Sequence, residues 1–167
     1  MITALRPLEA EPSTLEEAIA AWAAAEMKTR GHFGRKSLID AVPAHSVFYK
    51  ATVTEEHFRN SLLTMNPGPP ADTLEICARR TLSHPQSDPE WQKALRHICT
   101  FAFADVDLSC LLFGHDLCGP FTIIDGTHRL FSAYAAVAVL KRIAFEPFRA
   151  FVAISDCRWS AVHFPDR

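Results

Sequence analysis

Several features are missing from this sequence, and each absence argues against a class of protein. Its 167 residues carry a formal net charge of −2, so a main role in neutralising the phosphates of duplex DNA is not expected. The longest apolar run covers 133–140, well short of the ~18 residues that cross a bilayer. We therefore expect neither a membrane segment nor DNA as a partner.

Paired cysteine spacing is also missing. The cysteines are odd in number, scattered and without a Cys-x-x-Cys pair, so neither a disulfide framework nor a zinc ribbon is indicated. They are Cys77, Cys99, Cys110, Cys118 and Cys157. The first residues carry Glu9 and Glu11 where a signal peptide would have its apolar core. We expect free thiols and a cytoplasmic location.

What remains is the composition of an ordinary folded protein. Hydrophobic residues make up 49% of the chain and charged residues 22%, with no repeat, no low-complexity block and no long linker. A chain of this length buries roughly two thirds of its unfolded surface without disulfides or a structural metal. One domain over 1–167 is expected.

Hydrophobic periodicity and cap residues predict an α+β fold. Ser13 and Glu16 have the spacing of a capping box, Thr52 or Thr54 opens a second helix, and Asp72 and Asp88 are potential caps. Helices are expected over about 13–30, 52–66, 73–82, 89–101 and 127–140. Strands are expected over 36–42, 101–113, 121–126 and 148–156, with a hairpin turn at 114–120.

The segment IIDGTHR, 123–129, joins an expected strand to an expected helix. The first N–H groups of a helix have no partner within it, so such a turn attracts anions. Gly126 allows a sharp turn, Thr127 adds a hydroxyl, and Arg129 brings a forked donor for phosphate or carboxylate. His128 adds a donor or a proton relay. Asp125 can cap the helix, orient an imidazole or hold a metal ion.

A purely structural interpretation fits the same residues. Asp125 is then only the helix cap, Gly126 only a turn residue, and His128 and Arg129 only surface side chains. Local chemistry alone leaves both interpretations open.

The strand, the DGxHR pattern and a helix that starts LFSAYAA resemble the signature of the ParB/sulfiredoxin superfamily, in which this turn binds nucleotide phosphates. The resemblance covers 121–142, with further support from a strand-helix unit at 37–58 and the strand at 148–154. It implies a ParB/sulfiredoxin-like domain, in which a small mixed sheet packs with helices and the middle segment is long and helical.

Departures from the family pattern narrow the function that this resemblance implies. Sulfiredoxin-like members place a nucleophilic cysteine where this chain has Thr127, so peroxiredoxin repair is not expected. Partitioning members continue into a helix-turn-helix region, whereas this chain ends about 25 residues after its motif helix. The small free-standing members remain, and the best understood of them resemble kinases for free serine or a similar metabolite.

The resemblance thus implies a nucleotide-binding phosphotransferase, or a nucleotide hydrolase, that acts on a small hydroxyl-bearing metabolite such as a free amino acid. ATP or ADP and Mg²⁺ are the implied cofactors. Asp125 and His128 are the implied catalytic residues, and Gly126, Thr127, His128 and Arg129 the implied phosphate-binding residues. The alternative is a non-enzymatic module in which the turn binds a nucleotide or another anion to control association with a protein or DNA partner.

The catalytic base of such a kinase stays open. Similar kinases carry a glutamate in the early strand-helix region, often directly after a histidine, and here His45 is followed by Ser46. The acids nearest in sequence are Asp40, Glu55 and Glu56. An acid at this point would orient the acceptor hydroxyl for attack.

Two other arrangements of side chains compete with this interpretation. Cys110, His115 and Cys118 lie close in sequence and could be three ligands of a zinc site, although burial of both thiols in a hairpin is the simpler account. Cys118 with His128 could form a nucleophile and its base, with only proximity in support.

Overall fold

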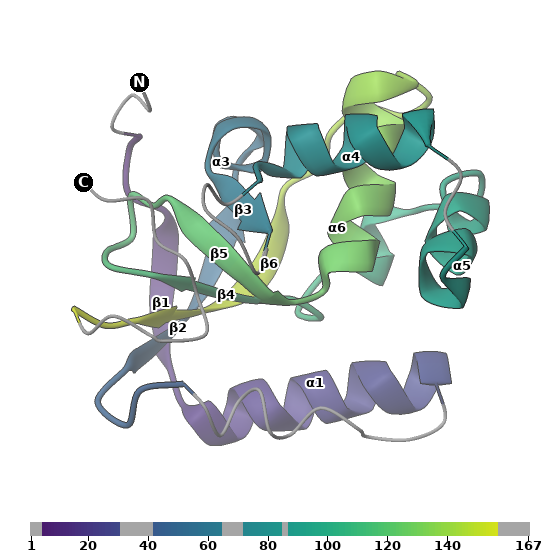
Figure 1. The fold of residues 1–167 in the computed structure, drawn as a ribbon. Coiled ribbons are helices and arrows are strands. Elements are labelled where there is room, and N and C mark those ends of the chain that lie inside the picture. Colours follow the sequence, from purple (N-terminus) through teal and green to yellow (C-terminus); the bar gives the residue numbers. More distant parts are fainter. Residues whose placement is uncertain (1–4, 31–41, 65–71, 85–86, 157–167) are drawn as a thin grey trace.

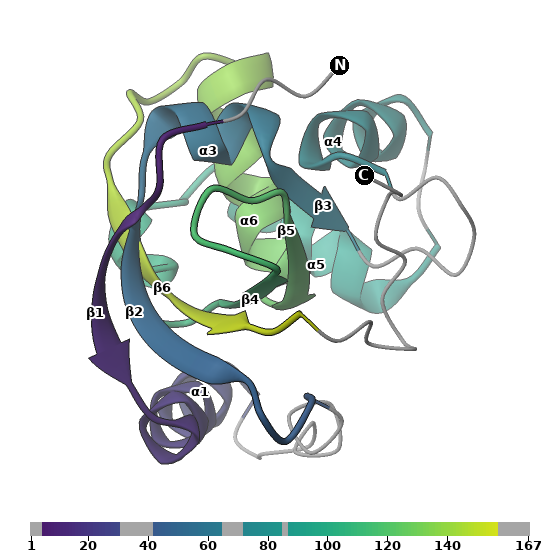
Figure 2. The same cartoon turned by 90° about the vertical axis from the view of Figure 1, so that its left-hand side faces the viewer.

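A six-stranded mixed sheet forms the centre of the α+β fold in the computed structural model, which describes residues 5–30, 42–64, 72–84 and 87–156. Its strands are β1 (Glu9–Ser13), β2 (Val47–Val53), β3 (Leu62–Thr64), β4 (Leu111–Gly114), β5 (Phe121–Asp125) and β6 (Phe148–Ile154). The strand order is β1-β2-β6-β4-β5-β3 (Figure 1, Figure 2). The β3–β5 and β4–β6 pairs are parallel, and the other neighbours are antiparallel.

Helices cover both faces of this sheet. The described ranges contain five α-helices, which are α1 (Leu15–Arg30), α3 (Glu55–Asn60), α4 (Leu74–Ser83), α5 (Pro89–His97) and α6 (Thr127–Tyr134). Figure 1 shows α1 below the sheet and α4, α5 and α6 on its other side. Ala18 and Trp22 of α1 pack with Phe151 of β6 in one core cluster, whereas the other helices contribute to a larger cluster on the opposite face. The sheet is therefore the middle of three layers.

Strand β5 and helix α6 form a buried unit at the centre of the molecule. Every residue of β5 is buried, as expected for a strand with helices on both faces. Phe121 and Ile123 belong to the larger cluster, and Ile124 belongs to the cluster under α1. Helix α6 continues as a π-helical turn over Ala135–Val139. The strand, turn and apolar helix expected over 121–142 are thus confirmed.

Other sequence-based predictions are confirmed where local signals are strong. The N-terminal helix expected over about 13–30 spans Leu15–Arg30. Asp88 caps α5 by accepting from the N–H groups of Glu90 and Trp91, at 2.9 and 3.2 Å. The last strand and the antiparallel pairing of β4 with β5 are also as expected. Helices α4 and α5 form the helical middle of the chain.

Several predictions in the first half of the chain are wrong. Thr14 rather than Ser13 caps α1, since its hydroxyl accepts from Glu17 N–H at 3.1 Å. Thr73 rather than Asp72 caps α4. The helix expected over 52–66 covers only Glu55–Asn60, and the apolar residues after it form β3 because they pair with β5. An apolar stretch of this length fits a helix or a strand, so tertiary pairing decides.

Strand β1 was not predicted. The strand expected over 101–113 is wrong for most of its length. Strand β1 is an exposed edge that includes Pro12, so it shows no apolar alternation. In the second case only Leu111–Gly114 is a strand, and Phe103–Asp105 form a 3₁₀ turn. Phe101 and Phe103 stack edge to face in the core, at 5.3 Å between ring centres. Their aromatic character therefore reflects core packing rather than sheet pairing.

Part of what the sequence predicts lies outside the described residues. The strand expected over 36–42 falls there except for Val42, which is not in a strand. Cys157 lies outside as well. Within the described ranges, no helix is long and apolar enough to cross a membrane.

A buried histidine makes the stability of this fold dependent on pH. His57 of α3 is 2% exposed, and its Nδ1 lies 2.8 Å from the hydroxyl of Thr54, the residue that caps this helix. Burial lowers the pKa of His57 below that of an exposed histidine. The unfolded chain therefore takes up this proton at a higher pH than the folded chain does.

We predict that the free energy of unfolding falls as the pH drops below about 6.5, the ordinary pKa of histidine, because protonation then favours the unfolded state. The contribution of His57 is complete above that pH. Urea denaturation between pH 5 and 7.5 measures it. His57→Gln should flatten the slope, and His84→Gln, which changes an exposed histidine, should not. An unchanged slope in His57→Gln contradicts the prediction.

Candidate functional site

The turn between β5 and α6 depends on a glycine. Gly126 is the N-cap residue of α6 and has a left-handed backbone, with φ of 96°. A β-carbon at this position would lie 2.6 Å from Cys110 Sγ. Two constraints, backbone conformation and close packing on Cys110, therefore favour glycine here.

Gly126 leaves the start of α6 without a side-chain cap. Asp125 is therefore not the helix cap, and that structural interpretation is wrong. The first turn of α6 also holds no acidic side chain. The first intrahelical bond runs from Leu130 N–H to Gly126 O at 2.9 Å, so the N–H of Thr127 has no acceptor within the helix. This end of α6 keeps the partial positive charge that attracts anions.

The buried Asp125 and the half-buried Arg129 form an ion pair. Arg129 Nη2 lies 3.0 Å from Asp125 Oδ2, with the two side chains 15% and 4% exposed. The same nitrogen donates to Ser109 O at 2.8 Å. Arg129 thus joins the end of β5, the loop before β4 and the first turn of α6. The purely structural interpretation expected Arg129 to be a surface side chain, and it is not. One nitrogen of its guanidinium, Nη2, already contacts Asp125 and Ser109.

His128 packs against an aromatic side chain. Its ring meets Trp91 of α5 edge to face, at 4.5 Å between ring centres. Trp91 in turn packs against Phe131, one turn further along α6. His128 is therefore half-buried and held in one orientation, which makes a simple surface role wrong.

The turn opens into a cleft of about 490 Å³, within the size range of small-molecule sites. All five residues of the DGTHR segment line this cleft. The other lining residues come from α1, α5 and α6, and from the segment before β4. They are Ala21, Ala24, Ala25, Glu90, Lys93, Ala94, His97, Ala104, Asp105, Asp107, Leu108, Ser109 and Ser132.

The two long walls of the cleft differ in chemistry. Among its described side chains, helix α1 lines the cleft with Ala21, Ala24 and Ala25, while Ile19 and Trp22 pack toward the sheet. The facing wall carries titratable side chains from α5, the loop and the turn. One wall is therefore small and apolar and the other polar, as in many sites for partly polar ligands.

Sequence reasoning missed the residues that α5 and the loop bring to the cleft. Glu90, Lys93 and His97 lie at spacings of three and four residues, so they share one face of α5. Asp105 faces His97, with 3.3 Å between Asp105 Oδ2 and His97 Nε2. The titratable stripe on α5 was a usable signal. The contact of Asp105 with His97 could not be predicted from the sequence, because it depends on the 3₁₀ turn.

The acids considered as a catalytic base are not in the cleft. Glu55 and Glu56 lie on α3 and do not line it, and Glu55 pairs with Arg59 at 2.8 Å. Asp40 lies outside the described residues. The cleft offers other acids, namely Glu90, Asp105, Asp107 and Asp125.

The structure separates the residues of the two competing arrangements. Cys110 and His115 lie at opposite ends of β4, and Cys118 and His128 flank opposite ends of β5. The structure therefore does not bring these residues together as a zinc site or as a Cys118–His128 pair. Burial raises the pKa of the Cys110 thiol to about 11. Cys77, Cys99, Cys110 and Cys118 are free thiols. Within the described residues, no group of three or more His, Cys, Asp and Glu side chains could hold a metal ion.

Comparison of this chain with protein-family models, with curated proteins and with solved structures finds no match in any of the three. The resemblance to the ParB/sulfiredoxin superfamily therefore stays a prediction, and a function has to be argued from the cleft itself.

We predict that Arg129→Ala lowers the free energy of unfolding by about 3 kcal/mol or more, because it removes the ion-pair partner of a buried carboxylate. Arg149→Ala is the matched control, since its ion pair with Asp107 is exposed and should contribute about 1 kcal/mol or less. Urea denaturation measures both. Equal losses in the two variants contradict the prediction.

A second prediction concerns Gly126→Ala. It should destabilise the protein by roughly 2–4 kcal/mol, from left-handed backbone strain and the contact with Cys110. In a Cys110→Ala background the same change should cost only about 1–2 kcal/mol, because the sulfur is gone and the strain remains. A double-mutant cycle by urea denaturation tests this coupling. Additive losses refute the proposed contact.

Proposed function

We propose that the cleft binds a nucleotide and that the protein transfers a phosphoryl group from ATP or ADP to a small hydroxyl-bearing metabolite, such as a free amino acid, or hydrolyses the nucleotide. One observation carries the proposal. The complete DGTHR turn lines the cleft at an uncapped helix start without acidic residues in its first turn. That is the arrangement by which proteins bind phosphate groups.

The polar wall supplies contacts suited to phosphates. In the proposed complex the phosphates lie at the first N–H groups of α6 and beside the hydroxyl of Thr127. Lys93 on α5 adds a positive charge, and Arg129 offsets the charge of Asp125. The buried carboxylate therefore does not leave a net negative charge under the phosphates.

The alanine wall suits the flat, apolar faces of a nucleobase. Ala21, Ala24 and Ala25 offer no side chain long enough to fill the cleft. A volume of about 490 Å³ leaves room for a nucleotide or for part of one with a small acceptor. Both substrates are proposed to share the cleft.

The Mg²⁺ ion implied by the family resemblance does not find a ready site in the described residues. Asp107 is held by Arg149, Asp125 by Arg129, and Asp105 by the Ala102 N–H and His97. A magnesium ion that takes part is therefore proposed to arrive bound to the nucleotide phosphates, and no protein ligand is assigned to it.

We predict that the wild-type protein binds ATP or ADP and, with Mg²⁺ and a pool of hydroxyl-bearing amino acids, forms a phosphorylated product or free phosphate. Lys93→Gln should weaken nucleotide binding about tenfold to a hundredfold, the effect of losing one charge-assisted contact. Lys141→Gln, an exposed lysine outside the cleft, is the matched control.

Calorimetric titration with ATP, ADP and CTP measures binding, and product analysis measures turnover. No nucleotide binding by the wild type overturns the proposal. Binding without turnover favours the alternative, a non-enzymatic module that uses a nucleotide to control association with a partner.

A further inference from the structure

His97 and Asp105 form a polar pair in the lining of the cleft. His97 is the last residue of α5, and Asp105 is the last residue of the 3₁₀ turn. His97 Nε2 lies 3.3 Å from Asp105 Oδ2, and the side chains are 35% and 37% exposed. Both residues line the cleft. They are thus close to each other and open to a ligand.

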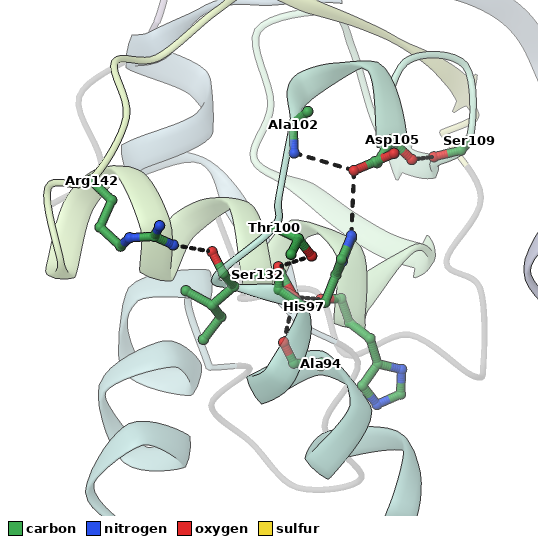
Figure 3. A network of polar contacts seen from close by, with 10 residues as sticks. Ala94, His97, Thr100, Ala102, Asp105, Ser109, Ser132 and Arg142 are labelled. Atoms are coloured by element: carbon green, nitrogen blue, oxygen red, sulfur yellow. Dashed lines mark hydrogen bonds and ion pairs between the residues drawn. The ribbon is translucent and has the colours of Figure 1, made fainter.

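The carboxylate of this pair is held in place by its own loop. Figure 3 shows Asp105 accepting from the Ala102 N–H, at 3.2 Å, and facing His97. The hydroxyl of Ser109 donates to Asp105 O at 3.1 Å. Asp105 N–H donates to Ala102 O at 2.9 Å. Backbone and side chain of Asp105 are therefore both fixed before a ligand enters.

The imidazole is oriented by this carboxylate and by packing. With the carboxylate at Nε2, the neutral ring carries its hydrogen there and its lone pair at Nδ1. The ring also packs edge to face on Phe101, at 5.9 Å between ring centres. No hydrogen bond of His97 Nδ1 is found within the described part of the chain. This nitrogen is available to accept a proton.

The pair is also held in a defined position relative to the anion-binding turn. Ser132 of α6 lies with its hydroxyl 3.0 Å from Ala94 O, one turn before His97 on α5. Arg142 donates to Ile98 O at 2.8 Å, just after His97. Figure 3 shows these contacts beside His97. They join α5 to α6 and its extension, so the spacing between His97 and the turn is set by the fold.

We infer that His97, oriented by Asp105, is the general base that takes the proton from the acceptor hydroxyl in the phosphoryl transfer. This inference rests on the proposed function. The hydroxyl oxygen forms a new bond to the terminal phosphorus of the nucleotide as the bond to the bridging oxygen breaks. The hydroxyl proton goes to His97 Nδ1, and the nucleotide leaves with one phosphate fewer. Asp105 and the C-terminal end of α5 stabilise the resulting imidazolium.

The other charged groups of the cleft are less suited to this role. Among the described residues, the other titratable side chains that line the cleft are Glu90, Lys93, Asp107, Asp125, His128 and Arg129. Hydrogen bonds from Arg149 lower the pKa of Asp107, so its carboxylate is a weak proton acceptor. Asp125 is buried in its pair with Arg129. Of the α1 side chains that the structure describes, those that line the cleft are alanines.

The test uses His97→Gln, with His84→Gln as an exposed histidine outside the cleft for control. We expect His97→Gln to lower kcat about 10²–10⁴-fold while the Kd for ATP changes less than about twofold. Asp105→Asn should lower kcat at least about tenfold. Added imidazole should restore activity to His97→Gly, which a merely structural histidine would not allow.

The outcomes separate this inference from the proposed function. If the wild type turns over and His97→Gln keeps its kcat within about threefold, the inference is overturned and the proposed function stands. If His97→Gln loses ATP affinity in parallel with kcat, the assignment as a base is also overturned. A wild type that binds ATP and forms no product with any acceptor overturns both.

Discussion

The ion pair between Asp125 and Arg129 is the interaction on which the site depends. It links the last residue of β5 to the first turn of α6, and the same guanidinium reaches Ser109 in the loop before β4. A buried carboxylate without its partner is costly, so the pair with Arg129 favours one backbone arrangement. Asp125 lies next to the positive end of α6, and Arg129 neutralises its negative charge. The shape of the turn and the proposed anion binding at the start of α6 thus depend on the same ion pair.

Much of the central unit could be predicted because its signals are local. The apolar strand, Gly126 and the small apolar residues of α6 follow one another along the chain, and the structure places them as the sequence pattern indicates. Asp88 and Thr54 could be recognised as helix caps for the same reason. The DGTHR residues were identified correctly as a group that shares one location. The N-cap position of Gly126 and the pairing of Asp125 with Arg129 were not predicted, because both depend on backbone geometry.

The remaining parts depend on contacts between distant segments. Strand β3 exists because Leu62 pairs with Phe121, and β1 exists because it adds to the edge of β2. Neither pairing leaves a periodic pattern in its own segment. The cleft has the same origin, since α1, α5 and the turn after β5 meet only in the folded chain. His97 shares a helix face with Lys93, yet its carboxylate partner follows from an irregular loop.

The alanines of α1 affect the conformational entropy that is lost when a ligand binds. Alanine has no rotatable side-chain torsion that moves a heavy atom, so a ligand that lies on Ala21, Ala24 and Ala25 orders nothing on that side. The shape of this wall is the shape of the helix backbone, which Trp22 anchors to the sheet. These three alanines therefore add no loss of side-chain conformational entropy when a ligand binds. This rigid surface limits the size of the ligand. Replacing one of these alanines by a larger residue would therefore change which molecules fit.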